Sequence, residues 1–534
     1  MKNYFKYIAI LALGMVACEP EFENPIDEQG YYSNGEADFT NYVALGNSLT
    51  AGYADGSLYL SGQKNSYPNI LAQQFSVVQD IEEFRQPLVN DNAGGLLAAG
   101  QPIPGFNTRL VLAFDEDGNP APMRYRGEDP TTEVTAVLDG PFNNMGVPGA
   151  KSYHLIAPNY GNLNGLSSQP ATANPYFVRF ASSPETTVLQ DALAQNPSFF
   201  TLWIGNNDVL GYATSGGTGV DQTGTGASPA TYGTNDITDP MVFAGVYLQM
   251  VQALTESASG GVLINIPDVT TVPYFTTVPY APLSPADPDF GPQIPTLNAT
   301  FAGLNQAFDF LQVPSRKISF SETGASPVLI KDESLTDLSQ QITKVLTESG
   351  AVDAATAALY GMQFGQVRQA TTEDLLVLTS SGVIGNINQQ RVQELMSFGL
   401  DQTSAAQLSV NGITYPLEDQ YVLIPQEQQT IAAATTAYNQ AIASAANQFD
   451  LGLLDVNAML TQLANGGIPF DAGNINATFV TGGAFSLDGI HLTPRGYSVI
   501  ANGIIEEINK TYNAEVPKVN PGNYATVTLS QDVQ

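Results

Sequence analysis

The chain is poor in several residue types that define common sites. It has one cysteine, two histidines and one tryptophan in 534 residues, and 18 basic residues against 51 acidic ones give a net charge of −33. One cysteine excludes an intramolecular disulfide, and a zinc site built from Cys and His would be short of ligands. No D-x-[DN]-x-[DN]-G calcium loop is present. An acidic calcium site stays possible in principle, but neither a metal nor a cofactor is expected. A field of this sign repels phosphate, so no nucleic acid partner is expected either.

The N-terminus carries an export pattern. Lys2 and Lys6 precede an apolar run at residues 7–17, which is shorter than the ~20 residues that span a bilayer. This predicts a signal peptide over residues 1–17. The sequence Met-Val-Ala-Cys ending at Cys18 resembles the bacterial lipobox, although methionine replaces the usual leucine. The resemblance implies that Cys18 is acylated and anchors the protein in a lipid bilayer of the bacterial cell envelope. Glu19 after the cysteine favours the outer membrane. An ordinary signal peptide with a chance cysteine is the alternative.

Strand and helix patterns alternate along the chain. Short apolar segments predict strands at residues 39–45, 141–147, 198–204, 261–266 and 451–456. Helical patterns occupy residues 68–77, 185–195, 241–257, 427–449 and 494–510. This alternation predicts an α/β fold with a mostly parallel five-stranded sheet covered on both faces.

The remaining segments predict the domain organisation. Residues 18–38 are acidic and contain Pro20 and Pro25, which is typical of a solvated tether. Residues 79–140, 209–240 and 267–426 do not fit the alternation, and we interpret them as large insertions, of which residues 79–140 are expected to be mostly loop. The prediction is one domain over residues 39–514, followed by a C-terminal tail at 515–534.

Four polar segments follow predicted strands. They are GNSLTAGY from Gly46, GVPGAKS from Gly146, GNND from Gly205 and, after the fifth strand and a loop, DGIH from Asp488. Each segment alone has an ordinary structural explanation, because serine after a strand is often a helix cap and asparagine is often a turn residue. Together they are informative, because ligands bind at the carboxyl ends of parallel strands. The Gly-x-Ser-x-Gly, His-Glu-x-x-His and P-loop motifs are absent.

In this order the four segments resemble the blocks of the SGNH hydrolases, also called GDSL esterases/lipases. Ser48 matches the nucleophile block, Gly149 the glycine block, Asn207 the Gly-x-Asn-Asp block, and Asp488 with His491 the Asp-x-x-His block. Asn47 stands where the family name has Asp. The resemblance implies a flavodoxin-like three-layer α/β/α fold. The insertions have no counterpart in small members of the family.

The resemblance also implies the roles of these residues. His491 would take the proton of Ser48, and Asp488 would hold the imidazole. The oxyanion hole would consist of the backbone N–H groups of Ser48 and Gly149 and the side-chain amide of Asn207. His154, the other histidine, lacks an Asp three residues before it and is the weaker candidate base.

The expected function is hydrolysis of carboxylic esters by a lipid-anchored serine esterase or lipase. One alternative is a carbohydrate O-deacetylase of the same mechanism. The substrate of the enzyme would then be either an acyl lipid or an acylated glycan. The other alternative is a non-enzymatic surface binding lipoprotein.

A near-repeat opens the longest insertion, TTVPYF followed by TTVPYA from Thr270. Because proline fixes φ and biases the preceding valine, both copies are expected to be extended. Tyr274, Phe275 and Tyr280 would then form one wall of a substrate groove. The alternative is that these aromatic side chains pack in a small core of the insertion itself.

Overall fold

The computed structural model describes residues 31–115, 118–350, 352–471 and 473–533. The predicted signal peptide and Cys18 lie outside these residues. Among the described residues, no helix combines the length and the apolar character needed to cross a bilayer.

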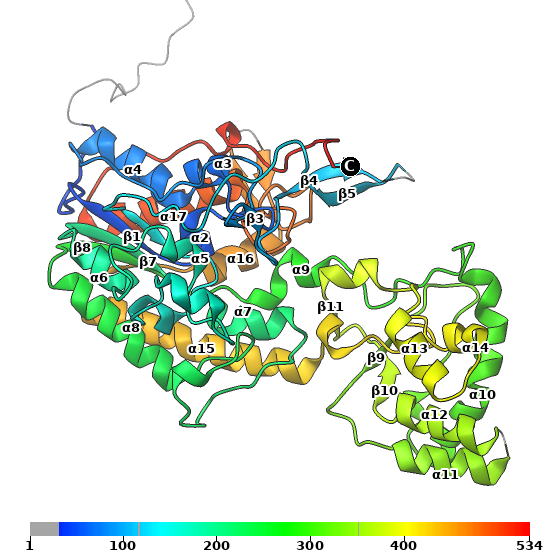
Figure 1. Ribbon diagram of the computed structural model, residues 1–534. Helices are drawn as coiled ribbons and strands as arrows, with labels where there is room; N and C mark the ends of the chain where they lie inside the picture. Colours follow the sequence, from blue (N-terminus) through cyan, green and yellow to red (C-terminus); the bar gives the residue numbers. More distant parts are fainter. Residues whose placement is uncertain (1–30, 116–117, 351, 472, 534) are drawn as a thin grey trace, which may run out of the picture.

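A five-stranded sheet forms the centre of the larger lobe of the molecule (Figure 1). Its order is β13-β8-β7-β1-β6, and every neighbouring pair is parallel. The strands are β1 (Tyr42–Gly46), β6 (Asn144–Gly146), β7 (Phe199–Trp203), β8 (Gly260–Ile264) and β13 (Gly452–Leu454). Numbered along the chain, this order is 2-1-3-4-5. The predicted α/β class with a five-stranded parallel sheet is confirmed.

Helices cover both faces of this sheet (Figure 1). One face carries α4 (Tyr67–Val78) and α17 (Pro494–Tyr512), and the other carries α6 (Val188–Leu193), α8 (Pro240–Thr255) and α15 (Pro425–Gln448). Every residue of β1, β7 and β8 is buried. Their sequences are apolar at almost every position, as a strand covered on both faces requires.

The segment 79–140 is more ordered than predicted. Besides loops it contains the hairpin of β4 (Leu110–Phe114) and β5 (Pro120–Arg124), and a short pair, β2 (Leu97–Ala98) and β3 (Gln101–Pro102). The C-terminal segment runs along this hairpin, where the Leu112 N–H donates to the Thr528 carbonyl at 2.8 Å.

The predicted tether is too long at its C-terminal end. The Glu36 N–H donates to the Tyr512 carbonyl at 2.7 Å, and Ala37 is 2% exposed. The chain is therefore packed against the domain before Asp38, because the small apolar side chain of Ala37 can be buried.

Residues 278–424 form a second lobe with a hydrophobic core of its own (Figure 1). Its helices are α10 (Ile294–Phe310), α11 (Ser339–Ser349), α12 (Ala354–Phe364), α13 (Gln389–Ser397) and α14 (Gln402–Gln407). Its strands are β9 (Leu329–Lys331), β10 (Val367–Gln369), β11 (Leu375–Leu376) and β12 (Val422–Leu423). The lobe is inserted in the chain between β8 and α15. Because the chain enters it from the carboxyl end of β8, the lobe lies at the carboxyl edge of the sheet.

The remaining elements are short or lie near the site. They are α2 (Ser48–Ala51), α3 (Leu60–Lys64), α5 (Pro175–Val178), α7 (Asn207–Thr214), α9 (Pro273–Thr276), α16 (Val456–Ala464), β14 (Ile468–Phe470) and β15 (Gly473–Ile475). Short 3₁₀ turns join several of them, among them η1 (Ser152–Ile156) and η8 (Asp419–Tyr421).

Candidate active site

Ser48 lies at the turn between β1 and α2. A Cβ on Gly46 would come within 2.1 Å of Thr50 Oγ1 and 2.3 Å of the Trp203 carbonyl oxygen, so only glycine fits at the end of the strand. Asn47 caps α2, its side-chain oxygen accepting from the Leu49 N–H at 3.0 Å. Ser48 therefore sits at the carboxyl edge of the sheet, at a helix start with a free N–H.

The structure brings Ser48, His491 and Asp488 together. His491 Nε2 lies 2.8 Å from Ser48 Oγ, and His491 Nδ1 lies 2.9 Å from Asp488 Oδ2. The histidine and aspartate side chains are 14% and 13% exposed. A hydroxyl, an imidazole and a carboxylate thus form one hydrogen-bonded chain from residues distant in the sequence.

Backbone N–H groups hold Asp488 in place. Its Oδ1 accepts from the N–H groups of Ile490 at 2.9 Å and His491 at 2.8 Å, and its Oδ2 accepts from Gly56 at 2.8 Å. Burial by itself would raise the pKa of Asp488, but attraction to His491 and these hydrogen bonds hold that pKa well below its usual range. The residue is a fixed carboxylate that orients the imidazole.

The loop after α2 supports this site. The sequence alone did not identify this supporting loop. Asp55 Oδ1 accepts from the Leu487 N–H at 3.0 Å, and the Asp55 N–H donates to Ser486 Oγ at 2.9 Å. Burial raises the pKa of Asp55 to about 6. The Tyr53 ring lies 4.6 Å from the His491 ring, centroid to centroid. The sequence did offer one signal, the closeness of these residues to the nucleophile segment. Tyr53 is the last residue of that segment, and Asp55 follows two positions later.

The segments that contain Gly149 and Asn207 lie at the same carboxyl edge of the sheet as Ser48. Gly149 has φ +81°, which favours glycine. Asn207 Nδ2 donates to the Ala150 carbonyl at 2.9 Å, and Asn47 Nδ2 donates to Asn206 Oδ1 at 3.2 Å. Within the described part of the chain, the N–H groups of Ser48 and Gly149 have no hydrogen-bond acceptor. These donors are therefore available to a ligand.

His154 has a structural setting instead. Its Nδ1 accepts from the Lys151 N–H at 3.0 Å, and its ring stacks on Tyr160 with centroids 4.7 Å apart. Burial and the nearby Lys151 charge lower the pKa of His154 to about 4. It is neutral at pH 7 and its Nδ1 lone pair is occupied, so it is a poor candidate base.

The predicted aromatic groove wall is largely wrong. The first copy of the near-repeat is not extended, because Pro273 begins the short helix α9; proline suits the first turn of a helix as well as an extended chain. Phe275 is 1% exposed in the core beside the sheet, and Tyr280 packs on the second lobe's core. Tyr274 does line a cleft, and its N–H donates to the Gly489 carbonyl at 2.9 Å.

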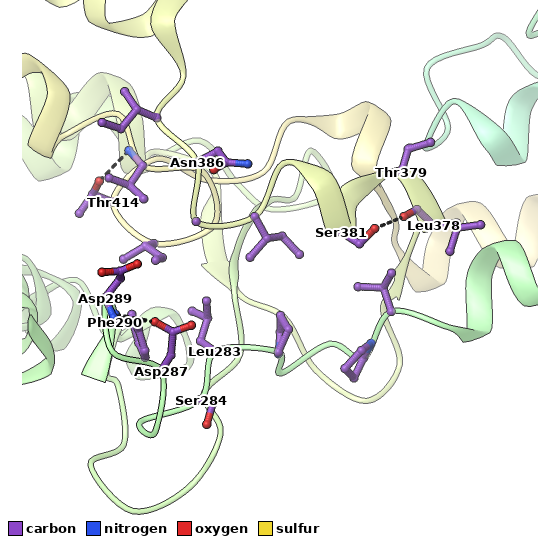
Figure 2. Close-up of a pocket in the computed structure, with 18 of the residues that line it drawn as sticks. Leu283, Ser284, Asp287, Asp289, Phe290, Leu378, Thr379, Ser381, Asn386 and Thr414 are labelled. Atoms are coloured by element: carbon purple, nitrogen blue, oxygen red, sulfur yellow. Dashed lines mark hydrogen bonds between the residues drawn. The ribbon is translucent and has the colours of Figure 1, made fainter. Parts of the chain in front are cut away.

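A large cleft of about 1880 Å³ extends from the Asp488 loop into the second lobe. Gly56, Asp488 and Ile490 line it on the sheet side. Figure 2 shows the second-lobe side, where hydroxyl, amide and carboxylate groups alternate with apolar side chains. Those labelled are Leu283, Ser284, Asp287, Asp289, Phe290, Leu378, Thr379, Ser381, Asn386 and Thr414. The second lobe therefore shares a cleft with the loop that carries Asp488.

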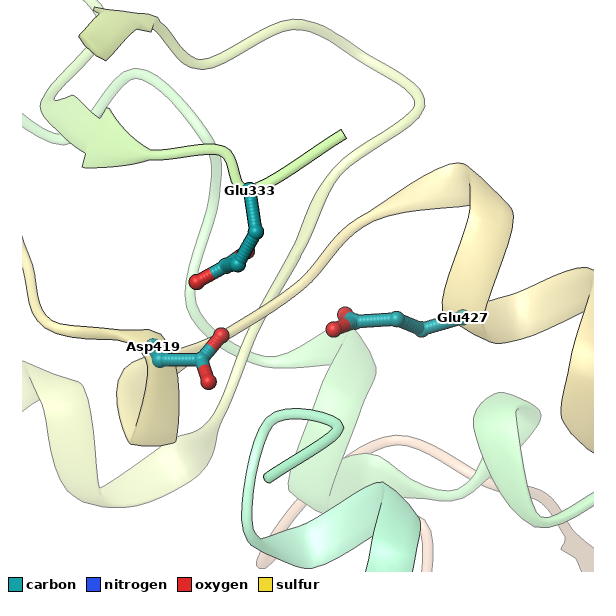
Figure 3. Close-up of side chains that lie close together, drawn as sticks. All are labelled: Glu333, Asp419 and Glu427. Carbon is teal, nitrogen blue, oxygen red and sulfur yellow. The ribbon is translucent and has the colours of Figure 1, made fainter. Parts of the chain in front are cut away.

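Three carboxylates meet where the second lobe joins α15 (Figure 3). One oxygen each of Glu333, Asp419 and Glu427 lies within 4.8 Å of the others. Burial and the neighbouring Glu333 raise the pKa of Asp419 to about 7, and burial raises that of Glu427 to about 8. Carboxylates of this kind can bind calcium, but we assign no ion here, because clustered acids alone do not define a site.

This cluster predicts a contribution to the free energy of unfolding that falls as the pH rises. Because the folded pKa of Glu427 is about 8 and the unfolded value is about 4.3, the folded state binds the proton more tightly. The contribution of Glu427 to stability is therefore greatest below pH 4 and declines as the pH rises to 8. Glu427→Gln keeps an acceptor for the Ile424 N–H but cannot ionise. We expect it to raise the free energy of unfolding at pH 8.5 by about 1 kcal/mol and to change little at pH 4.

Thermal unfolding at the two pH values measures this effect. Glu322→Gln, at an exposed position of the second lobe, is the control and should be neutral at both. A Glu427→Gln protein that is less stable than the wild type at pH 8.5 would show that the negative charge is needed there.

Comparisons with protein-family models, curated proteins and solved structures found no match to this chain. The site is therefore interpreted from its own geometry.

Proposed function

We propose that the protein is a serine hydrolase of the SGNH type that cleaves carboxylic esters through an acyl-serine intermediate. The observation that carries the proposal is the hydrogen-bonded chain from Ser48 through His491 to Asp488, with distances of 2.8 and 2.9 Å. The strand order 2-1-3-4-5 supports it, because that order is the flavodoxin-like arrangement implied by the family resemblance.

The reaction follows from this chain of groups. His491 Nε2 accepts the Ser48 proton as Oγ attacks the ester carbonyl carbon. The oxyanion receives hydrogen bonds from the N–H groups of Ser48 and Gly149 and from the Asn207 amide. His491 then protonates the departing alcohol. Water attacks the acyl-serine with the same base, which releases the acid and restores Ser48. Asp488 stays ionised and stabilises the imidazolium.

The large cleft favours a bulky alcohol part. Its second-lobe wall is mainly apolar but also carries neutral hydrogen-bonding groups such as Ser284, Asn386 and Thr403, which suit a hydroxyl-rich molecule. Asp287 and Asp289 on that wall disfavour an anionic one. This observation favours the carbohydrate O-deacetylase reading of the same chemistry over an anionic acyl lipid. The proposal keeps Cys18 as the acylated membrane anchor.

Hydrolysis of p-nitrophenyl acetate and butyrate by the purified protein tests the proposal. We expect saturable turnover and covalent labelling by a fluorophosphonate probe. A protein that hydrolyses none of a broad set of esters and takes up no label would instead favour the non-enzymatic binding alternative.

Asn207→Ala should lower kcat by roughly 10²–10³ and change KM little, because the amide hydrogen that is not donated to the Ala150 carbonyl would serve charge that forms only in the transition state. Steady-state kinetics on p-nitrophenyl butyrate measures the split. Asn206→Ala is the matched control: Asn206 accepts from Asn47, so its loss should be milder. A larger loss in Asn206→Ala would mean that the neighbouring residue supplies the donor.

A further inference from the structure

A tight turn fastens the segment that carries Asp488 to the loop after α2. Residues 54–57 close as a two-residue hairpin turn, whose end residues exchange backbone hydrogen bonds of 3.1 and 3.0 Å. The central residues Asp55 and Gly56 have φ values of +53° and +69°, the left-handed pair that a type I′ turn requires. The Gly56 N–H donates to Asp488 Oδ2 at 2.8 Å, and the same oxygen lies 2.9 Å from His491 Nδ1. The turn therefore holds the carboxylate oxygen that orients the imidazole.

The Asp55 side chain makes a second attachment to the same segment. Its Oδ1 accepts from the Leu487 N–H at 3.0 Å, and its Oδ2 accepts from the Tyr59 hydroxyl at 2.8 Å. Its backbone N–H donates to Ser486 Oγ at 2.9 Å. With the glycine bond described above, three hydrogen bonds join the turn to the segment. A displacement of Asp55 would therefore move the backbone that carries Asp488.

A carboxylate at this position lowers the stability of the fold. Asp55 is 3% exposed and forms no ion pair with any basic side chain that the structure describes. The charge that favours its ionised form is that of Arg109, whose guanidinium lies over the Tyr59 ring, 5.2 Å from the centroid. Asp488 adds a like charge, and Tyr497 is the remaining titratable group close to both carboxylates. Burial is the main reason why the pKa of Asp55 is raised to about 6.

The turn itself does not need this charge. Asn-Gly is a favoured central pair of a type I′ turn, and an asparagine oxygen would accept from the Leu487 N–H as the carboxylate does. Its NH₂ group would donate to the Tyr59 oxygen in place of the present bond. A buried charge that the local structure does not require, next to a catalytic group, is typical of a functional site. What the charge adds is strength, because a hydrogen bond to an ionised acceptor is stronger than one to a neutral acceptor.

This inference rests on the proposed ester hydrolysis. We propose that Asp55 is a positioning residue, and that its ionised carboxylate holds Asp488 where that residue orients His491. Asp55 acts through the Leu487 N–H and through the turn that presents the Gly56 N–H. When Asp55 is protonated, the bond to Leu487 weakens, the segment is held less firmly, and kcat falls. The charge thus lowers stability near neutral pH and raises activity there.

Asp55→Asn tests this, because it keeps the turn and the hydrogen-bonding positions and removes the charge. At pH 8, kcat on p-nitrophenyl acetate should fall about 10-fold with KM unchanged, while the unfolding temperature rises. At pH 5 most of the wild-type carboxyl is itself protonated in the folded state, so the wild-type-to-variant ratio of kcat should fall to about 2 or less. The difference in unfolding temperature should shrink in the same direction. A residue that served only the fold would not gain stability while it loses kcat.

Asp239→Asn is the matched control, since it alters another buried carboxylate that accepts backbone N–H bonds. It should leave kcat unchanged at both pH values.

The outcomes separate the two proposals. If the wild type hydrolyses no ester, the proposed function fails and the positioning role fails with it. If the wild type is active and Asp55→Asn keeps its full kcat at pH 8, the function stands and the positioning role is wrong. A kcat ratio that is the same at pH 8 and pH 5 would also overturn the role of the charge. So would a variant that fails to fold or is less stable than the wild type at pH 8, because the carboxylate would then serve the fold.

Discussion

Ser48→Ala should lose essentially all esterase activity, a fall in kcat of about 10⁵–10⁶-fold, and keep its fold. The hydroxyl accounts for the only Ser48 side-chain hydrogen bond among the described residues, the one to His491 Nε2. The serine side chain does not cap α2, because Asn47 provides that cap. Removing one oxygen therefore removes the nucleophile and little of the structure.

Kinetics and covalent labelling together measure this. A fluorophosphonate should label the wild type and leave Ser48→Ala unlabelled, and the two should unfold at similar temperatures. Ser498→Ala is the matched control, since it removes a buried hydroxyl from α17 that donates only to the Arg495 carbonyl. It should keep its labelling and its activity. Persistent labelling of Ser48→Ala would assign the nucleophile to another residue.

The sheet was predictable because its strands are simple in composition. The segments that became β7 and β8 are short and apolar at almost every position, and a strand buried on both faces produces that pattern. Once the strands were known to be parallel, the residues after them had to share one edge. This is why Ser48 and Asn207 could be expected at the same edge. Asp488 lies beyond β13, after α16 and the β14–β15 pair, so its place beside Ser48 was expected only from the family resemblance.

The second lobe was not predictable in the same way. Its strands are short, with two or three residues each, and its core joins side chains from β9, α10 and α12 that no local periodicity connects. Proline at position 273 is compatible with both an extended chain and a helix start, and the packing of Phe275 in the core accompanies the helix. The meeting of Glu333 with Glu427 likewise depends on how the lobe docks, which is a tertiary property.

The supporting loop of the active site was missed for a related reason. Gly56 contributes only a backbone N–H to Asp488. Every residue except proline has such a donor, so the residue type gives no sign of this contact. Asp55 has a chemically informative side chain, but it acts on the backbone of Leu487, far along the chain. Sequence reasoning finds groups that react more readily than groups that hold reacting groups in place.

Asp488→Asn should lower kcat by about 10⁴-fold with the fold retained. Asp488 Oδ1 accepts two backbone N–H bonds, so the single oxygen of asparagine is expected to take that position. Its NH₂ group would then face His491 Nδ1, where the carboxylate now lies at 2.9 Å, and the Gly56 N–H that now donates to Oδ2 would lose its acceptor. Imidazole could accept that hydrogen bond only by carrying its proton on Nε2, and in that tautomer it cannot take the proton of Ser48.

The matched control is Asp239→Asn, which alters another buried carboxylate that accepts backbone N–H bonds, from Gly224 and Met241, far from the triad along the chain. It should keep wild-type kcat. In Asp488→Asn the rate of fluorophosphonate labelling should fall together with kcat, because both reactions require the Ser48 proton to be removed, while KM changes little. If Asp488→Asn keeps more than a tenth of the wild-type kcat, the carboxylate does not set the tautomer of His491. Its role would then be limited to shaping the loop between Leu487 and His491.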